Sequence, residues 1–364
     1  MVYNVVIKIS CSGKNPLLCI YGAFKMRTFV KSLFMSFVPL IGLYLLMPLL
    51  IFTFPTFFQK LFFLSVVKLP FVDYNNLTAH GLNGGYNFYL KINSTNGADS
   101  EKLGVWHILP TSLQDQLPAN FTDKQLKQLV QSSNNSIVVY LHGNSFDRTS
   151  LHRCELYRLL AALDYHVFAI DYEGYGDSTG RPTELSVVED AKAIYKYARE
   201  LSLNKNDVYI WGHSMGTAVA SKATAELTMS GIPPSALVLE APFNNLHDVI
   251  SNHPFSVPFR FLPWFESTVI QPLIRSGLVM QSDEHIKHIG CPLLVFHAQD
   301  DHIIPVKLGR KLVEVAQSAG KVVKYIEFDA SRNFLHKYIH RAEELPSIVK
   351  DFFTTWSRIK AKSD

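Results

Sequence analysis

The chain has 364 residues, of which 48% are hydrophobic, and it is long enough for one large domain with a sizeable core plus an appendage. Its formal net charge of +4 is small for this length, and much of the excess lies before residue 32. The charge therefore does not indicate a nucleic-acid-binding surface, and it bears on membrane topology instead.

An uncharged apolar stretch runs from residue 32 to 58, which exceeds the about 20 residues that a helix needs to cross a bilayer. We predict one transmembrane helix over 32–58, kinked at its prolines, after an N-terminal segment 1–31. A juxtamembrane linker, 59–79, should lie at the level of the lipid head groups. A signal peptide is the alternative, but about thirty residues precede the run, whereas signal peptides begin with a short basic region.

The residues around this stretch indicate its orientation. Before it the chain carries only basic charges, at Lys8, Lys14, Lys25, Arg27 and Lys31. The positive-inside rule places this end in the cytosol and everything after the span in the lumen or outside the cell. N-glycosylation sequons begin after the span at Asn76, Asn93, Asn120 and Asn134, which agrees with that orientation. A polar cytosolic linker is the alternative interpretation of this region.

Beyond residue 80, short β-branched runs alternate with helical periods, which is typical of an α/β fold with a mostly parallel sheet. We predict one such domain over 80–364. The expected strands are 87–92, 104–108, 136–140, 166–170, 208–211, 236–239, 293–297 and 323–328. The expected helices are 151–163, 186–201 opening with a capping box of Ser186 and Glu189, 306–319 and 345–359.

Residues 244–290 interrupt this alternation. They contain four prolines and no strand pattern, and their aromatic residues are Phe255, Phe259, Phe261, Trp264 and Phe265. The segment is an insertion between two strands. It is either an irregular packed excursion or a cap over an apolar pocket, and both interpretations stay open at this point.

A pentapeptide, Gly212-His213-Ser214-Met215-Gly216, stands between the strand that ends near residue 211 and a helix rich in small residues. Strand, sharp turn and helix are the context of a nucleophile elbow, in which glycines let neighbouring backbone approach closely. We therefore expect Ser214 to be a catalytic nucleophile.

A serine hydroxyl needs a base and an orienting acid, which in this fold follow it along the chain in the order acid, then histidine. Asp300 and Asp301 follow a predicted strand, and Asp301 is preferred because of its spacing to Ile304-Pro305, leaving Asp300 as a solvated neighbour. His336 is the preferred base because it comes first after the last strand. We expect His340, one helical turn later, to be a surface residue.

Acyl transfer also needs donors for the oxyanion. The backbone N–H of Met215 is the first candidate, because it follows the nucleophile. Asn144, in the loop after the strand 136–140, is the second, and a plain turn at His142-Gly143 is the alternative. No histidine pair has metal-ligand spacing with acids on one helix face, so we predict no metal and no cofactor.

Together these motifs resemble the α/β-hydrolase superfamily, and in particular its membrane family of abhydrolase-domain monoacylglycerol and lysophosphatidylserine lipases. The resemblance covers about residues 80–355 and rests on His142–Asn144, Asp171–Ser178, Ile210–Thr217, His253–Val257, Leu308–Lys311 and His336–Ile339. It implies single-chain glycerolipid substrates, the endoplasmic reticulum membrane and a lumenal active face. The chain departs from the family at Ser145-Phe146, where smaller residues are expected, and in the loop before His336, which lacks an expected glycine.

The sequence thus predicts a membrane-anchored serine hydrolase that cleaves carboxylic esters of single-chain glycerolipids. An acyl-protein thioesterase is an alternative that cytosolic exposure of the domain would favour. A catalytically inactive hydrolase fold used as a binding module is a third reading, against which the complete serine, acid and histidine set argues.

Overall fold

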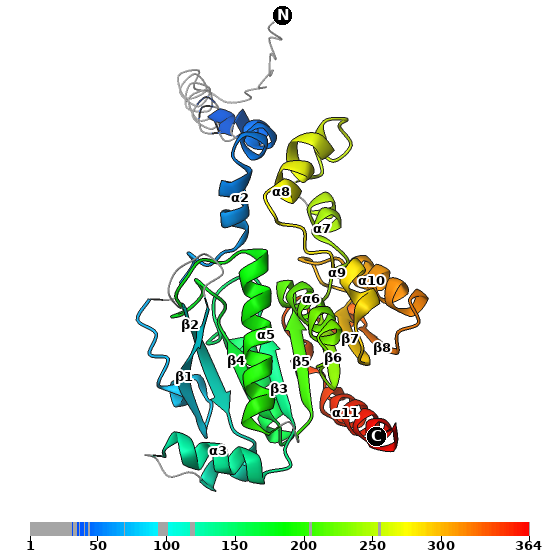
Figure 1. The fold of residues 1–364 in the computed structure, drawn as a ribbon. Coiled ribbons are helices and arrows are strands. Elements are labelled where there is room, and N and C mark those ends of the chain that lie inside the picture. Colours follow the sequence, from blue (N-terminus) through cyan, green and yellow to red (C-terminus); the bar gives the residue numbers. More distant parts are fainter. Residues whose placement is uncertain are drawn as a thin grey trace, which may run out of the picture.

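The computed structural model describes residues 31, 35, 37–39, 41–42, 44–68, 70–93, 101–116, 121–203, 206–253 and 256–363. Its centre is an eight-stranded sheet in the order β1-β2-β4-β3-β5-β6-β7-β8 (Figure 1). β1 and β2 pair antiparallel, as do β2 and β4, and the remaining pairs are parallel. The strands are β1 (Gly85–Ile92), β2 (Glu101–Ile108), β3 (Ile137–Leu141), β4 (His166–Ile170), β5 (Val208–His213), β6 (Ala236–Glu240), β7 (Leu293–Ala298) and β8 (Val323–Phe328).

The central strands are continuous apolar runs because helices cover both faces of the sheet. In β3 every residue is buried. Ile137, Val139 and Leu141 join one hydrophobic cluster, whereas Val138 and Tyr140 join another on the opposite face, as the alternation of side chains along a strand requires.

Two groups of helices complete the layers (Figure 1). The hydrophobic cluster that contains Ile137 also includes buried residues of four helices: α3 (Asp123–Ser132), α5 (Glu184–Leu201), α6 (Met215–Met229) and α10 (Val306–Ser318). The cluster on the opposite face, which contains Val138, also includes buried residues of α4 (Leu151–Ala162) and α11 (Leu345–Ser363). Short helical turns occur at Leu77–His80, Thr111–Gln116, Ala330–Arg332 and Ile339–Arg341.

The predicted α/β fold and each predicted strand are confirmed, but the capping box at Ser186 is wrong. Helix α5 begins earlier, with Thr183 as the N-cap: its Oγ1 accepts a hydrogen bond from Ser186 N at 3.0 Å, and Ser186 Oγ accepts one from Thr183 N at 2.9 Å. The extra turn includes Glu184, whose Oε2 accepts hydrogen bonds from Val279 N and Met280 N. A contact distant in sequence thus favours the earlier start.

Helix α3 was not predicted, because its apolar face is narrow and most of its residues are polar. It opens with a capping box in which Thr122 Oγ1 accepts a hydrogen bond from Gln125 N, and the Gln125 side chain accepts one from Thr122 N. Leu126 and Val130 are buried against the sheet, so two positions one turn apart suffice to fix the helix.

In the described part of the chain, no single helix is long and apolar enough to cross a bilayer. One pair of helices, Phe37–Thr53 and α2 (Pro55–Phe62), has sufficient length and composition together but bends by 106° where they meet. In the described residues of 32–58, which we predict as one kinked helix, the chain forms two helices that meet at Phe54. Proline has no N–H and is favoured at a helix start, so Pro55 ends one hydrogen-bond ladder and opens the next. Residues 1–30 lie outside the described part.

The insertion 244–290 is helical and stands beyond the carboxyl ends of the parallel strands, beside the N-terminal helices (Figure 1). It contains α7 (Leu246–Asn252), a π-helix at Glu266–Ile270, α8 (Gln271–Arg275), α9 (Ser282–His285) and a 3₁₀ turn at Ile286–His288. Phe259, Phe265, Val269 and Ile270 form a small hydrophobic cluster of their own, separate from the two clusters of the sheet. We call this insertion the cap.

Candidate active site

Ser214 occupies the sharp turn between β5 and α6. Its backbone has φ 55° and ψ −121°, a conformation that is strained for a residue with a side chain and that recurs at functional sites. The turn fits because its flanks are glycines: a Cβ on Gly212 would clash with the Gly216 carbonyl oxygen, and one on Gly216 with that of Leu141. The Ser214 N–H donates to Glu240 O at 2.9 Å, which ties the elbow to β6.

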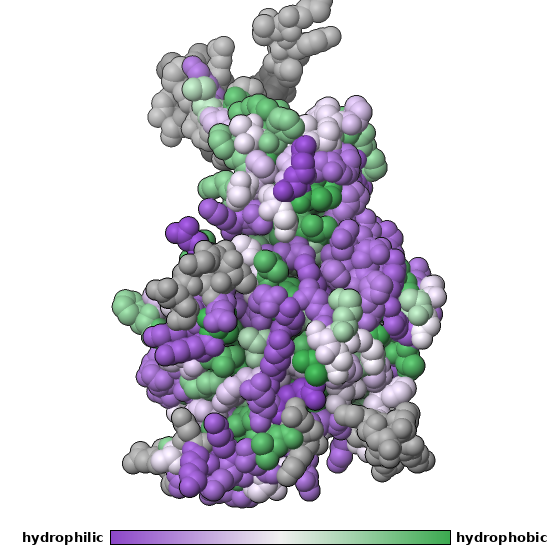
Figure 2. Space-filling view, in the orientation of Figure 1, coloured by the Kyte–Doolittle hydropathy of each residue, from purple (hydrophilic) through white to green (hydrophobic). Residues whose placement is uncertain are grey.

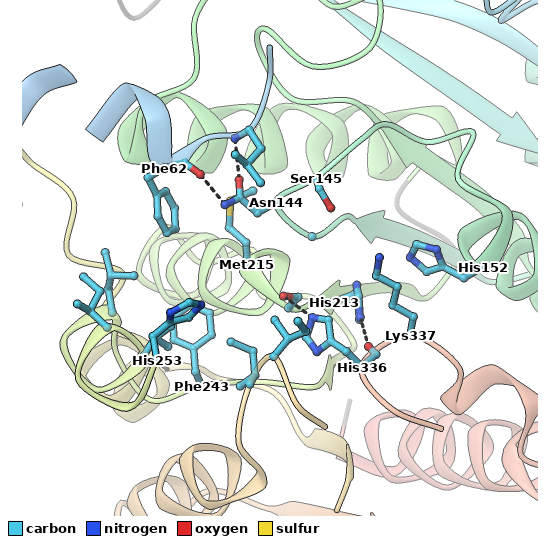
Figure 3. Close-up of a pocket in the computed structure, with 18 of the residues that line it drawn as sticks. Phe62, Asn144, Ser145, His152, His213, Met215, Phe243, His253, His336 and Lys337 are labelled. Carbon is cyan, nitrogen blue, oxygen red and sulfur yellow. Dashed lines mark hydrogen bonds between the residues drawn. The ribbon is translucent and has the colours of Figure 1, made fainter. Parts of the chain in front are cut away.

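The structure brings together Ser214, His336 and Asp301, which three different loops carry. His336, labelled in Figure 3, has its Nε2 2.9 Å from Ser214 Oγ. Its Nδ1 lies 2.7 Å from Asp301 Oδ2. A neutral imidazole satisfies both contacts when Nδ1–H donates to the carboxylate and Nε2 accepts from the hydroxyl. This is the arrangement that turns a serine into a nucleophile.

Asp301 is held as a carboxylate. Its Oδ1 accepts hydrogen bonds from Ile303 N and Ile304 N, both at 2.9 Å, and His297 Nε2 lies 3.4 Å from Oδ2. Burial alone would raise its pKa, but hydrogen bonds from His297 and His336 outweigh burial and hold the pKa of Asp301 well below its usual range. A permanent negative charge therefore faces His336 Nδ1.

Two predictions about neighbouring residues are wrong. Asp300 is not a solvated neighbour: it is half-buried, and its Oδ2 accepts a hydrogen bond from Leu335 N at 3.1 Å, which positions the loop that carries His336. His340 is not a surface residue: it is buried, and its Nε2 lies 2.5 Å from Glu155 Oε2 on α4. In these hydrogen bonds neither Asp300 nor His340 contacts Ser214 or His336. Both residues therefore support the site indirectly.

Asn144 lies in the expected loop, but its side chain is engaged elsewhere. Nδ2 donates to Phe62 O at 2.6 Å (Figure 3). Oδ1 accepts from Tyr175 Oη at 2.8 Å and from Leu64 N at 3.2 Å. Any role of Asn144 in binding an oxyanion therefore falls to its backbone N–H. Met215 is the first residue of α6, so its N–H belongs to the donors that a helix start leaves without an intrahelical partner.

A cavity of about 530 Å³ lies over these residues, within the size range of ligand sites. Its walls differ in chemistry. Its apolar lining residues are Phe62, Leu64, Phe243, Leu246, Val249, Ile250, Ile303 and Ile304. Its polar lining residues include His152, Arg153, Lys337 and Ser145. In Figure 3, Phe62, Phe243 and His253 lie across the site from His152, Lys337 and Ser145.

The sequence motifs assign no role to the three basic residues among these polar lining residues. Arg153 is buried and donates to the carbonyl oxygens of Asp147 and Ser145, which holds the loop that carries Asn144. The buried Nε2 of His152 has no hydrogen-bond partner among the described residues, and the half-buried Lys337 lines the same cavity. Burial first, and then the charge of Arg153, lower the pKa of Lys337.

Lys337 directly follows His336 in the sequence. This position is the feature of the sequence that could have indicated a side chain in the same cavity. His213, which precedes the nucleophile, donates from Nε2 to His336 O at 2.9 Å and so supports the base through its backbone. Within the residues that the structure describes, no group of three or more His, Cys, Asp or Glu side chains could hold a metal ion.

Residues 138–337 match the family model described as the alpha/beta hydrolase family. The chain is 39% identical over 317 residues to the lysophosphatidylserine lipase ABHD12 of Mus musculus, covering 86% of this chain and 78% of that protein. The Danio rerio protein of the same name is 36% identical over 318 residues, covering 86% and 81%. Protein ABHD12B of Homo sapiens is 34% identical over 275 residues, covering 74% and 73%.

Solved structures share the fold at lower identity. The esterase Pf2001 of Pyrococcus furiosus superposes with a TM-score of 0.56 at 20% identity, covering 80% of this chain and 97% of that one. An alpha-beta hydrolase from Vibrio vulnificus reaches 0.59 at 14% identity, covering 81% and 92%. By its family match and by its identity to these relatives, the chain belongs to the α/β-hydrolase family, in the group that contains the proteins named lysophosphatidylserine lipase ABHD12 and ABHD12B.

Proposed function

We propose that the chain is a membrane-anchored serine hydrolase that cleaves the carboxylic ester of single-chain glycerolipids through Ser214, His336 and Asp301. The observation that carries the proposal is the unbroken contact of Ser214 Oγ with His336 Nε2 and of His336 Nδ1 with Asp301 Oδ2. The family match and the lipase names of the relatives support the lipid ester as the substrate class.

The geometry gives each residue its step. Ser214 Oγ attacks the ester carbonyl carbon while its proton passes to His336 Nε2, and Asp301 stabilises the imidazolium that forms. The backbone N–H groups of Met215 and Asn144 stabilise the oxyanion. The glycerol oxygen then leaves with the proton from His336, and the acyl group stays on Ser214. Water, deprotonated by His336, releases the fatty acid in the reverse sequence.

The two-sided cavity supports a substrate with one apolar and one anionic end. An acyl chain matches the wall formed by residues such as Phe62, Phe243 and Ile250. The ammonium of Lys337 matches a phosphate or carboxylate of the head group, and the imidazole of His152, with its unpartnered Nε2, lies in the same cavity. We therefore favour lysophosphatidylserine over neutral monoacylglycerol, in agreement with the names of the relatives.

Two features support the anchor and its orientation. Large apolar side chains of the helix Phe37–Thr53 are exposed, among them Leu45 at 61% and Leu49 at 58%, which suits a lipid environment. Of the sequons, Asn76, Asn93 and Asn134 are exposed, and Asn120 lies outside the described residues. A lumenal domain at the endoplasmic reticulum membrane, with the N-terminus cytosolic, agrees with both.

The decisive test is labelling with a fluorophosphonate probe, which reacts with an activated serine. We expect Ser214→Ala and His336→Ala to lose labelling in membranes from expressing cells. Ser256→Ala, which removes another hydroxyl from the same cavity, and His340→Ala should keep it. Labelling that persists in Ser214→Ala would refute the assignment, and hydrolysis of lysophosphatidylserine and monoacylglycerol by the wild type then ranks the substrates.

Topology is tested independently. Deglycosylation should increase the mobility of the wild-type protein, and replacing Asn76, Asn93, Asn120 and Asn134 with Gln should abolish the shift. An unshifted protein whose catalytic domain is digested by protease outside intact microsomes would contradict lumenal placement. It would favour an acyl-protein thioesterase acting in the cytosol.

A further inference from the structure

A second cavity, of about 590 Å³, adjoins the one over Ser214. The two share a wall: Phe62, Leu64, Ile250, His253 and Ser256 line both. A ligand bound at Ser214 on the apolar side can therefore continue past these residues into the second cavity. We call the second cavity the outer groove.

The outer groove is apolar, and three separate parts of the chain build it. The helix Phe37–Thr53 contributes Met47 and Ile51, α2 contributes Phe58 and Leu61, and the cap contributes residues such as Val269. Polar side chains are few in this lining: Tyr44, His253 and Ser256 stand among apolar residues. The outer groove fits an extended hydrocarbon chain.

The helix Phe37–Thr53 packs directly on the cap. The rings of Tyr44 and Phe259 lie 4.9 Å apart between centroids, within the range of favourable aromatic contacts. Tyr44 and Ile51 pack against the cap cluster that includes Phe265 and Val269. The N-terminal helix therefore closes one side of the outer groove as part of the folded structure.

The outer face of the same region is apolar as well. Leu49 and Phe52 of the N-terminal helix are 58% and 51% exposed, and Phe261 of the cap is 79% exposed. Figure 2 shows hydrophobic patches at this end of the molecule, while hydrophilic residues dominate the body. The groove thus opens among surfaces suited to lipid, and a chain could enter it without crossing water.

We propose that the outer groove is the acyl-chain subsite of the enzyme, and that the membrane anchor forms one of its walls. The proposal rests on the proposed function, since it places the acyl group of an ester whose carbonyl lies at Ser214. The anchor then has two roles: it holds the domain at the bilayer, and it selects the chain. The head group stays on the polar side, near Lys337.

The test uses two substitutions on one helix in the full-length protein. Ile51→Trp fills the outer groove from the anchor side, whereas Leu49→Trp adds the same bulk to the exposed face. We expect Ile51→Trp to lower kcat/KM for palmitoyl lysophosphatidylserine by roughly tenfold for every two methylenes that it excludes. Hydrolysis of p-nitrophenyl butyrate and fluorophosphonate labelling should stay unchanged, and Leu49→Trp should match the wild type on all substrates.

Val269→Trp blocks the outer groove from the cap side and should reproduce the loss of long-chain activity. It keeps the test valid if Ile51→Trp does not fold, which lost butyrate hydrolysis would reveal. Unchanged long-chain kinetics in both folded variants would overturn the proposal. Absence of labelling in the wild type would instead refute the proposed function.

A direct measurement uses a long-chain alkyl fluorophosphonate with a diazirine at the end of its chain. After reaction at Ser214 and irradiation, peptide mass spectrometry should find the crosslink in 37–62 or in the cap. Crosslinks confined to other peptides of the hydrolase domain would show that the chain takes another path, although labelling at Ser214 succeeded.

Discussion

Replacing Asp301 with Asn separates the role of its charge from that of its shape. Oδ1 is held by the N–H groups of Ile303 and Ile304, both at 2.9 Å, so the amide oxygen of Asn must occupy that place. The NH2 group then faces His336 Nδ1, which must accept a hydrogen bond and carry no proton. The imidazole proton moves to Nε2 and points at Ser214 Oγ, where a base is needed.

The expected loss follows from these contacts. Turning the amide to restore the reactive tautomer would leave two backbone donors without an acceptor, at about 1–3 kcal/mol each. Losing the carboxylate beside the imidazolium removes up to about 4 kcal/mol at the effective dielectric constant typical of proteins. Allowing for overlap between the two effects, we expect kcat to fall by about 10³- to 10⁴-fold, or about 4–5 kcal/mol.

The assay is the hydrolysis of p-nitrophenyl butyrate, with circular dichroism to verify folding. Asp300→Asn is the matched control: its acceptor bonds Leu335 N rather than His336, and Asn keeps an oxygen for that bond, so kcat should fall less than about tenfold. A folded Asp301→Asn enzyme within tenfold of the wild type, or an equal loss in Asp300→Asn, would refute the assignment of the acid.

Further predictions concern the head group, the elbow and the pH dependence of stability. Lys337→Met should lower kcat/KM for lysophosphatidylserine by about 10- to 100-fold, the value of one charge-assisted hydrogen bond, and leave monoacylglycerol hydrolysis within about twofold; equal losses on both substrates would contradict an anion subsite. Gly216→Ala should cost about 1–3 kcal/mol by overpacking against the Leu141 carbonyl oxygen, measured by urea unfolding, and should reduce fluorophosphonate labelling; wild-type stability would show that the elbow can relax. Burial raises the pKa of Glu240 to about 7. The folded state is therefore destabilised relative to the unfolded state as the pH rises from about 4.5 to 7, because Glu240 ionises more readily in the unfolded chain. Glu240→Gln keeps an acceptor for Trp211 Nε1 and should therefore stabilise the protein at pH 8 by up to about 3 kcal/mol, but not at pH 4. A thermal midpoint that is unchanged at both pH values would count against this burial effect.

The parts that the sequence predicts best are those fixed by local chemistry. The apolar runs of β3 to β7 match buried strands because a parallel sheet needs hydrophobic residues on both faces, whereas β8, at the edge of the sheet, is only partly buried. The elbow is predictable because only glycine fits at 212 and 216. Chain order then narrows the acid and base to a few residues, and the structure brings Asp301 and His336 to Ser214.

The parts that escaped prediction depend on partners distant in sequence. The side-chain contacts of Asn144 are one example, because its amide is bound by Phe62 and Leu64, about 80 residues earlier. His340 looks exposed from its helical spacing, but Glu155 on α4 buries it. An apolar run such as 32–58 says nothing of the angle at its interruption or of the cap residues against which Tyr44 and Ile51 pack.

The bonds between Asn144 and the segment after α2 also have a mechanical consequence. Leu64 forms a parallel β-bridge with Ser145, so the first residues beyond α2 are fastened to the loop beside the nucleophile. A force that tilts or lifts α2 would be transmitted through this bridge to the geometry around Ser214. In a protein anchored as proposed, bilayer thickness and tension would then change turnover itself as well as access to substrate, and cutting the chain after Phe62 would disconnect the bridge at Leu64 from α2.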